Sequence, residues 1–247
     1  MSYKSLLPAL FCASSLSVLA GPAETVGVSP QLETFPTWTL SLEALYLEAR
    51  GALASFEDQD HEFGGRFELA HHFSRNDGVR ARYFSFEGTQ SSSSIDEWGP
   101  DLSTADLEYF RLFRWSGNTA LVSAGARYLS YDERFDFGAD LDTKFDGVGP
   151  TLGVELERPI AQGVAFFGKG RASYIFGNAD GFALSNNEGF VAEVSAGLSY
   201  SFAVSGIPTT ISLAYEYHFY DSFATDAVGD IQNAFLSGVS LGVQLEF

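Results

Sequence analysis

The stretch that decides the fold is Val239-Ser240-Leu241-Gly242-Val243-Gln244-Leu245-Glu246-Phe247, at the end of the chain. Every odd position in it is apolar, and every even position is small or polar. Successive side chains of a strand point to opposite faces, so this alternation predicts a strand with one apolar face and one wet face. A strand of this kind needs neighbours, and the same period of two recurs through most of the chain.

Nine further segments have the same pattern, which gives ten predicted strands. Many are close to the roughly 9–11 residues that a tilted strand needs to cross the hydrocarbon of a membrane. The predicted strands cover residues 38–49, 62–73, 79–86, 106–114, 120–131, 148–157, 164–176, 191–202, 209–220 and 235–247.

The connections between these strands alternate strictly between short turns and long polar loops. The short turns are residues 74–78, 115–118, 158–163 and 203–208, and the long loops are residues 50–61, 87–105, 132–147, 177–189 and 221–234. Short turns on the periplasmic side and long loops outside are typical of outer-membrane barrels. We therefore expect an all-β, transmembrane, antiparallel up-and-down barrel of ten strands, or of twelve if residues 21–37 or a long loop hide a hairpin. The alternative is a soluble antiparallel barrel or sandwich with an aromatic core.

The N-terminus predicts export. Lys4 precedes an uncharged run at residues 5–20, as in a secretory signal peptide, and both the single Cys and the single Met lie within residues 1–20. Residues 21–37 contain three prolines and no strand period, so we interpret them as a periplasmic linker. The expected organisation is a signal peptide at 1–20, a linker at 21–37 and an outer-membrane barrel at 38–247.

The chain is strongly acidic, with a formal net charge of -18. This excess of negative charge argues against nucleic acid as a partner. The five long loops contain 18 of the 32 Asp and Glu residues but only three basic ones, Arg50, Arg134 and Lys144. If the topology is right, most of the negative charge faces outward, toward lipopolysaccharide.

The strand period also predicts which side chains line the lumen. Basic residues favour one wall and acidic residues the other, so one hypothesis is a narrow pore with a transverse field. The alternative is a set of internal ion pairs, such as Glu155 and Glu157 with Lys169 and Arg171, that block the lumen. The candidate pore-lining residues are Arg80, Arg82, Arg127, Glu155, Glu157, Lys169, Arg171, Glu193, Glu216 and Glu246.

The strand at 106–114 fits the pattern poorly, because Phe110 and Leu112 would face the lumen if Arg111 faced lipid. An arginine at the middle of the bilayer costs about 2–4 kcal/mol in a barrel. We therefore expect Arg111 inside, with a bulge or a local slip of register nearby.

Little in the sequence predicts catalysis or a cofactor. His71 and His72 are adjacent on a strand and point to opposite faces, so they cannot easily share a metal. His218 follows Glu216 by two residues, but no second acid pair accompanies them as a protease would require. Residues 140–147 resemble a calcium loop only faintly, because Lys144 stands where an oxygen ligand is needed. We expect no enzyme, no metal and no cofactor.

Two resemblances sharpen the expected function. A strand that ends in an aromatic residue, here Phe247, is similar to the closing strand of bacterial outer-membrane barrels, which the barrel-assembly machinery recognises. The phrases that resemble the Legionella-type pore-forming outer-membrane protein family are Glu43-Ala44-Leu45-Tyr46-Leu47, Gly78-Val79-Arg80-Ala81-Arg82-Tyr83, Gly125-Ala126-Arg127-Tyr128-Leu129 and Phe167-Gly168-Lys169-Gly170-Arg171-Ala172. This resemblance implies a barrel of major outer-membrane protein type, which would form a narrow passive pore for small solutes or ions. The alternative is a non-conducting structural or adhesive barrel with acidic surface loops, and the oligomeric state stays open.

Overall fold

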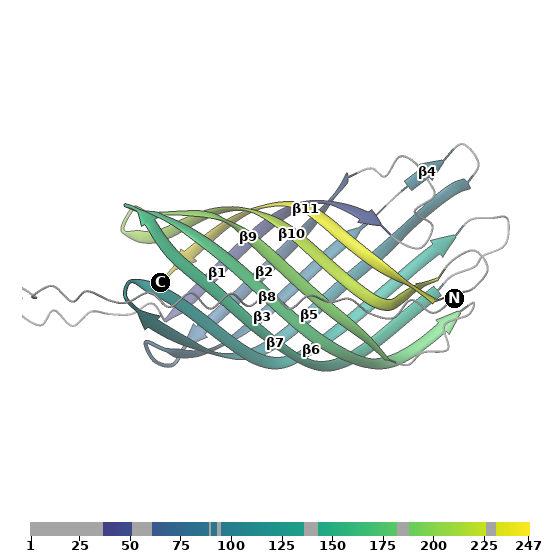
Figure 1. The fold of residues 1–247 in the computed structure, drawn as a ribbon, viewed down its shortest axis with the longest axis horizontal. Helices are drawn as coiled ribbons and strands as arrows, with labels where there is room; N and C mark the ends of the chain where they lie inside the picture. The colour runs from purple at the N-terminus through teal and green to yellow at the C-terminus, as the bar shows by residue number, and fades with distance from the viewer. Residues whose placement is uncertain are drawn as a thin grey trace, which may run out of the picture. The chain divides into compact units, whose positions relative to one another are not determined.

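Eleven strands make up most of the described part of the chain (Figure 1). The computed structural model describes residues 37–50, 61–88, 90–92, 95–135, 143–181, 188–225 and 231–247, all within one unit of the chain, Phe35–Phe247. The predicted signal peptide at 1–20 and all of the predicted linker except Thr37 lie outside these residues. The strands are β1 (Trp38–Arg50), β2 (His61–His72), β3 (Asp77–Glu87), β4 (Gln90–Ser92), β5 (Ile95–Trp115), β6 (Asn118–Phe135), β7 (Thr143–Ala161), β8 (Val164–Gly181), β9 (Glu188–Val204), β10 (Ile207–Thr225) and β11 (Ile231–Glu246).

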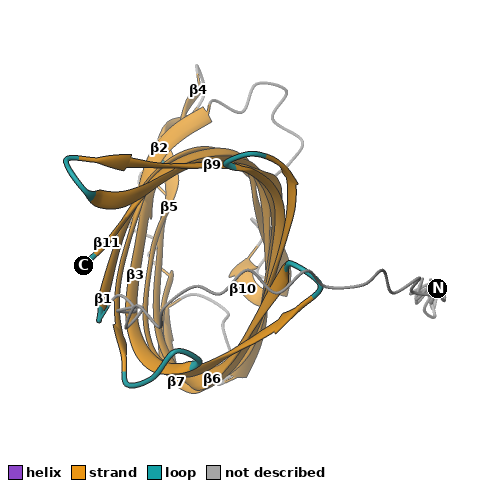
Figure 2. Ribbon diagram, turned by 90° about the vertical axis from the view of Figure 1, so that its left-hand side faces the viewer, coloured by secondary structure: helices purple, strands orange, loops and turns teal. Residues whose placement is uncertain are grey.

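Ten of these strands form a closed antiparallel barrel (Figure 2). Each long strand pairs with the next one along the chain, except that β3 pairs with β5 because the short β4 pairs only with β5. The barrel closes where β1 pairs with β11, from Thr39 opposite Glu246 to Arg50 opposite Phe235. The prediction of an all-β, ten-stranded antiparallel barrel is confirmed.

The short connections all lie at one end of the barrel, which we call the turn end. The predicted turns are confirmed and are tighter than expected, with two residues between β5 and β6, β7 and β8, and β9 and β10. Ser116 and Gly117 have φ of 46° and 80°, and Ser205 and Gly206 have φ of 52° and 85°. Two consecutive positive φ angles are typical of the type I′ turn, whose twist matches that of the flanking strands.

The opposite end, which we call the loop end, has longer strands than the sequence predicts. The segment 87–105, expected to be a loop, contains β4 and the first part of β5, and β6 and β7 extend to Phe135 and from Thr143. An ion pair of 2.9 Å between Lys144 and Asp132 joins β6 and β7 in this extension. The prediction of loops here was wrong, because many polar and charged residues in these segments hide the apolar alternation that marks a strand in sequence, although Leu102 and Phe145 are buried inside the barrel.

The outward side chains form an apolar surface around the whole barrel. On every one of the ten strands an apolar or aromatic residue of this face is 41% to 65% exposed within the chain. One example per strand, in chain order, is Leu42, Phe67, Tyr83, Leu107, Val122, Leu152, Phe166, Val194, Leu213 and Leu241. No described part of the chain covers this surface. This pattern is the reverse of a soluble barrel with an aromatic core, whose outer face would be polar.

Exposed aromatic residues gather near both ends of the outer face. Those nearer the turn end are Trp38, Phe73, Phe113, Trp115, Phe202 and Phe247. Those nearer the loop end are Tyr46, Tyr83, Tyr128, Tyr174 and Tyr217. Amphipathic rings favour the two interfaces of a bilayer.

Arg111 lies on the outer face, so its predicted inward position was wrong. Its side chain is 58% exposed and lies 3.6 Å from Asp77, the first residue of β3. The register of β5 with β3 runs without a bulge to its last pair, Arg111 with Asp77, and the register with β6 continues through Arg111. The arginine is tolerated because it stands close to the turn end, where it reaches an acidic side chain and water. Phe110 and Leu112 consequently face the lumen.

Among the described residues, no helix is long and apolar enough to cross a membrane.

Candidate functional site

The lumen has three levels, and the one at the loop end is apolar. Fourteen buried residues, none more than 8% exposed, form a single cluster inside this half of the barrel. We call it the apolar plug, and it consists of Leu45, Leu47, Ala49, Phe84, Phe86, Leu102, Leu129, Tyr131, Phe145, Ile175, Val191, Tyr220, Ala234 and Leu236. The sequence predicted polar or small inward residues, and that prediction was wrong at this level. A signal was present in Ala44-Leu45-Tyr46-Leu47, which is apolar on both faces of its strand.

Charged side chains fill the middle of the lumen. Arg127 is 0% exposed and lies between two carboxylates: Nε and Nη2 donate to Asp106 at 2.6 and 2.9 Å, and Nη1 donates to Glu193 at 2.5 Å. Arg82 donates to the other oxygen of Glu193 at 2.9 Å. Bidentate pairs between arginine and carboxylate are among the strongest hydrogen bonds available to side chains.

A second group of charges comes from β1, β2 and β10, on the other side of the lumen. Arg66 donates to both oxygens of Glu216, at 3.0 and 2.7 Å, and also pairs with Glu43. His218 is 1% exposed and shares a hydrogen bond of 3.0 Å between its Nε2 and Glu216. The Arg66 guanidinium also lies 5.6 Å from the centre of the Phe84 ring, so the charged level packs directly against the apolar plug.

A third group links the charged level to the turn end. Arg80 donates to Glu108 at 2.6 Å and pairs with Glu155, and Arg171 donates to Glu108 at 3.0 Å. Lys169 lies 3.2 Å from Glu43. We call these three groups together the ion-pair network.

The network does not have the charge separation that the sequence suggested. Arg66 stands on the expected acidic wall beside Glu43 and Glu216, and Asp106 and Glu108 stand on the expected basic wall. Each of these arginines therefore faces carboxylates at close range. The alternative of internal ion pairs describes the lumen better, although Glu155 pairs with Arg80 and Lys169 with Glu43, across the lumen.

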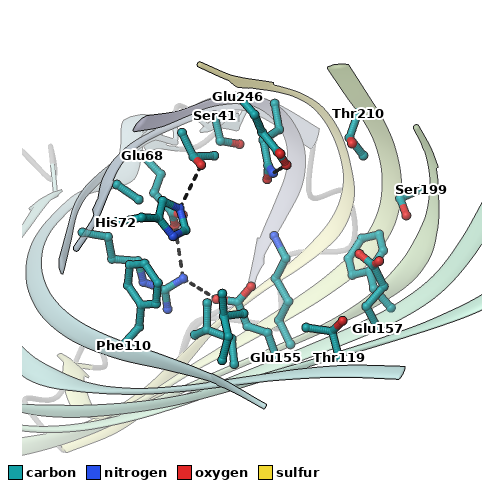
Figure 3. A pocket seen from close by; sticks show the side chains of 18 of the residues that line it. Ser41, Glu68, His72, Phe110, Thr119, Glu155, Glu157, Ser199, Thr210 and Glu246 are labelled. Carbon is teal, nitrogen blue, oxygen red and sulfur yellow. Dashed lines mark hydrogen bonds and ion pairs between the residues drawn. The ribbon is translucent and has the colours of Figure 1, made fainter. Parts of the chain in front are cut away.

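Below the network, a cavity of about 340 Å³ lies at the turn end (Figure 3). We call it the turn-end chamber. Its lining includes Ser74 and Arg75 of the turn between β2 and β3, so it opens at that end of the barrel. Glu68, Glu155, Glu157 and Glu246 contribute carboxylates, as Figure 3 shows. A second cavity, of about 30 Å³, lies within the ion-pair network, which is room for roughly one water molecule.

All ten residues predicted to line the lumen face inward, in two groups, and Arg80, Glu155 and Lys169 of the first group also line the chamber. Eight belong to the ion-pair network: Arg80, Arg82, Arg127, Glu155, Lys169, Arg171, Glu193 and Glu216. Glu157 and Glu246 line the chamber, and neither forms an ion pair with a basic side chain among the described residues. The network residues that the candidate set omitted are Glu43, Arg66, Asp106, Glu108 and His218. Arg66 was visible from the sequence, since it lies one residue before the outward Phe67.

The arrangement offers little for catalysis or metal binding. Within the described ranges, no group of three or more His, Cys, Asp or Glu side chains could hold a metal ion. His72 faces the lumen and shares a hydrogen bond of 3.1 Å with Thr39, whereas His71 lies outside against Trp38, with the rings tilted by 41° and their centres 4.4 Å apart. Residues 140–142 of the faint calcium loop lie outside the described residues.

No protein-family model matches the chain, and no curated protein does either. Solved structures do match its fold. The outer-membrane protease OmpT from Escherichia coli is 9% identical, with a TM-score of 0.52 over 88% of this chain and 100% of that chain. Neisserial surface protein A is 13% identical, with a TM-score of 0.44 over 87% of this chain and 100% of that chain. At these identities the likeness concerns the fold alone, and the fold of this chain is that of the outer-membrane β-barrel proteins.

Proposed function

We propose that this chain is an integral protein of the bacterial outer membrane whose barrel spans the bilayer and whose lumen is closed to solutes. The uncovered apolar face on all ten strands supports a position within the membrane, because exposing so large an apolar surface to water would be energetically unfavourable. The two groups of aromatic residues support the same position, with the turn end in the periplasm and the loop end outside. Export through residues 1–20 belongs to this proposal.

The single observation that carries the closed lumen is the apolar plug stacked on the ion-pair network. The plug residues are at most 8% exposed, and several, such as Leu45, Leu129 and Ile175, are 0% exposed. A barrel of about eight strands is just filled by its own side chains, and here ten strands are filled by large ones. The geometry therefore favours the non-conducting alternative over a narrow passive pore of the Legionella type.

A closed barrel acts through what it presents at its ends. Six acidic residues of the outer face stand near the loop end: Glu48, Glu87, Asp101, Asp132, Asp146 and Glu188. These six residues form a negatively charged crown. We propose a structural or adhesive role, in which this crown meets cationic partner surfaces or is bridged to lipopolysaccharide phosphates by divalent ions. Phe247 would serve the barrel-assembly machinery, and its outward, 54% exposed ring is compatible with that role.

A catalytic role is the weaker candidate, although OmpT is a protease. His218 and Glu216 are 1% and 3% exposed and lie beneath the apolar plug, where a peptide cannot reach them. An acid–base pair needs contact with its substrate, so we propose that the chain is not an enzyme.

Recording in planar bilayers tests the closed lumen. The purified full-length barrel should give no conductance steps, whereas a general porin handled in the same way should give them. Reproducible steps from the pure protein would restore the passive pore.

The adhesive role is tested separately by exchanging Asp132, Asp146 and the acidic residues between them for Asn or Gln. Retention on a positively charged surface should then fall, and retention equal to wild type would exclude the crown as the binding surface.

A further inference from the structure

The turn-end chamber has two walls of different chemistry. Phe110, Leu112 and Leu121 form an apolar wall, in which Leu112 and Leu121 are cross-strand neighbours on β5 and β6. Ser41, Ser199, Thr210, Ser212 and Gln244 form a polar wall on β1, β9, β10 and β11. Leucine side chains that face a water-filled opening are unfavourable, because their apolar surface stays in contact with water. A bound apolar group would remove this surface from water, so the apolar wall indicates an apolar ligand.

The basic side chains that line the chamber already have partners, whereas some of its carboxylates lack a basic partner among the described residues, so its unpaired charge is negative. Arg80 is bound by Glu108 and Glu155, and Lys169 is bound by Glu43. Arg114 donates to the carbonyl oxygen of Arg75 and to Asn76 Oδ1, which holds it at the rim. Arg75 lines the chamber as well, and its side chain is not free either. Glu157 has no basic partner among the described residues, and the carboxylates of Glu155 and Glu246 are near enough to repel it.

A buried hydroxyl group also lacks a partner in the chamber. Ser199 is 6% exposed and lines the polar wall, and its Oγ forms no hydrogen bond with any described residue. Figure 3 places Ser199 and Glu157 on the same side of the chamber, with Glu246 across from Glu157. Buried polar groups normally have a partner, so this hydroxyl group is available to a bound molecule.

We propose that the turn-end chamber binds a small organic cation, an alkylammonium with a short apolar chain. The ammonium group donates to the carboxylate of Glu157 and the Ser199 hydroxyl group, Glu246 adds negative charge from across the chamber, and the alkyl chain packs on Phe110, Leu112 and Leu121. A volume of about 340 Å³ is at the lower end of the range for ligand pockets, which sets the small size. The binding is independent of whether the lumen conducts.

Butylammonium is the probe, tested by calorimetry on the full-length barrel in a neutral detergent, with empty micelles as the blank. We expect saturable binding of butylammonium and none of butyrate. Each methylene group removed, from butyl- toward methylammonium, should weaken binding about fourfold. Butyrate binding of similar strength, or heat no larger than that of empty micelles, would overturn the proposal.

Variants locate the site. Glu157→Gln with Glu246→Gln should weaken butylammonium binding about tenfold or more, whereas Glu87→Gln, on the outer face at the loop end, should leave it unchanged. Folding of each variant is checked by the mobility of unheated samples on gels. If the double variant does not fold, Glu157→Gln alone decides, since this exposed side chain has no ion-pair partner among the described residues. Unchanged binding in a folded variant would refute the chamber as the site.

Discussion

Arg127 and Asp106 are cross-strand neighbours on β6 and β5, joined by two hydrogen bonds of 2.6 and 2.9 Å, with both side chains 0% exposed. Such a pair adds little net stability compared with an apolar pair of the same shape, but breaking it leaves a buried charge uncompensated. The ion-pair network is therefore sensitive to the loss of single members.

Arg127→Ala should lower the free energy of unfolding by about 3–5 kcal/mol, because Asp106 and Glu193 lose their principal cation. Urea-induced unfolding in phospholipid vesicles, followed by the mobility of unheated samples on gels, measures this change. Arg127→Met combined with Asp106→Leu should recover much of the loss, since Glu193 keeps Arg82 at 2.9 Å. Arg158→Ala on the outer face is the control. A loss from Arg127→Ala no larger than that control would contradict a buried network.

The outer face of β5 gives a prediction about membrane depth. Leu107→Arg should cost about 2–4 kcal/mol, because Leu107 is 65% exposed at mid-strand, where we expect the bilayer centre. Arg111→Ala, four residues away at the turn end, should change stability by less than about 1 kcal/mol, because its ion pair with Asp77 is exposed. The same unfolding assay measures both variants. Equal effects at the two positions would contradict the placement of the apolar belt.

Inward glycines let neighbouring backbones approach closely. A Cβ atom on Gly197 would lie 2.1 Å from the Leu213 carbonyl oxygen and 2.8 Å from the Ala214 Cβ. Gly197→Ala should therefore force β9 away from β10 and cost about 1–3 kcal/mol. Gly65→Ala is the matched control, because a Cβ there meets nothing within 4 Å. Thermal unfolding of the two variants compares them, and equal midpoints would show that β9 accommodates the methyl group.

The apolar plug should behave like the core of a soluble protein. Phe84→Ala should cost about 3–5 kcal/mol, because the ring is 1% exposed and its removal leaves a cavity beside Arg66. Leu45→Met keeps the volume and should cost less than about 1.5 kcal/mol. Urea unfolding separates the two variants. A small effect of Phe84→Ala would mean that water already enters this level of the lumen.

The sequence was sufficient to predict the barrel and the inward direction of most of its charges. The period of two assigns Arg127, Glu193 and Glu216 to the lumen without any knowledge of neighbours. The alternation of turns and loops predicts the strand order, because consecutive strands joined by tight turns must pair. Both signals are local, and local signals can be read from one sequence.

Contacts across the lumen could not be predicted in the same way. Arg66 and Glu216 are 150 residues apart, and their meeting depends on how the closed barrel staggers its strands. Asp106 and Glu108 were omitted because Arg111 was placed at mid-bilayer and therefore inside the barrel, which puts Asp106 and Glu108 on the outer face of the same strand. The depth of Arg111 depends on how far β5 extends toward the loop end, and the sequence pattern did not show that extension. The apolar plug was missed because Leu45 and Leu47 face inward while their neighbours Ala44 and Tyr46, which face outward, are apolar too. With both faces apolar, the alternation of apolar and polar residues that assigns the inner face is lost.

The closure of β1 on β11 has a kinetic consequence. Thr39 and Glu246 stand opposite each other although almost the whole chain separates them, so this seam has the longest loop to close of any pairing in the sheet. Until β11 has paired with it, β1 remains an open edge that can pair with foreign strands. The unclosed chain is therefore prone to aggregate with other copies, and pairing of β1 with β11 ends this exposure.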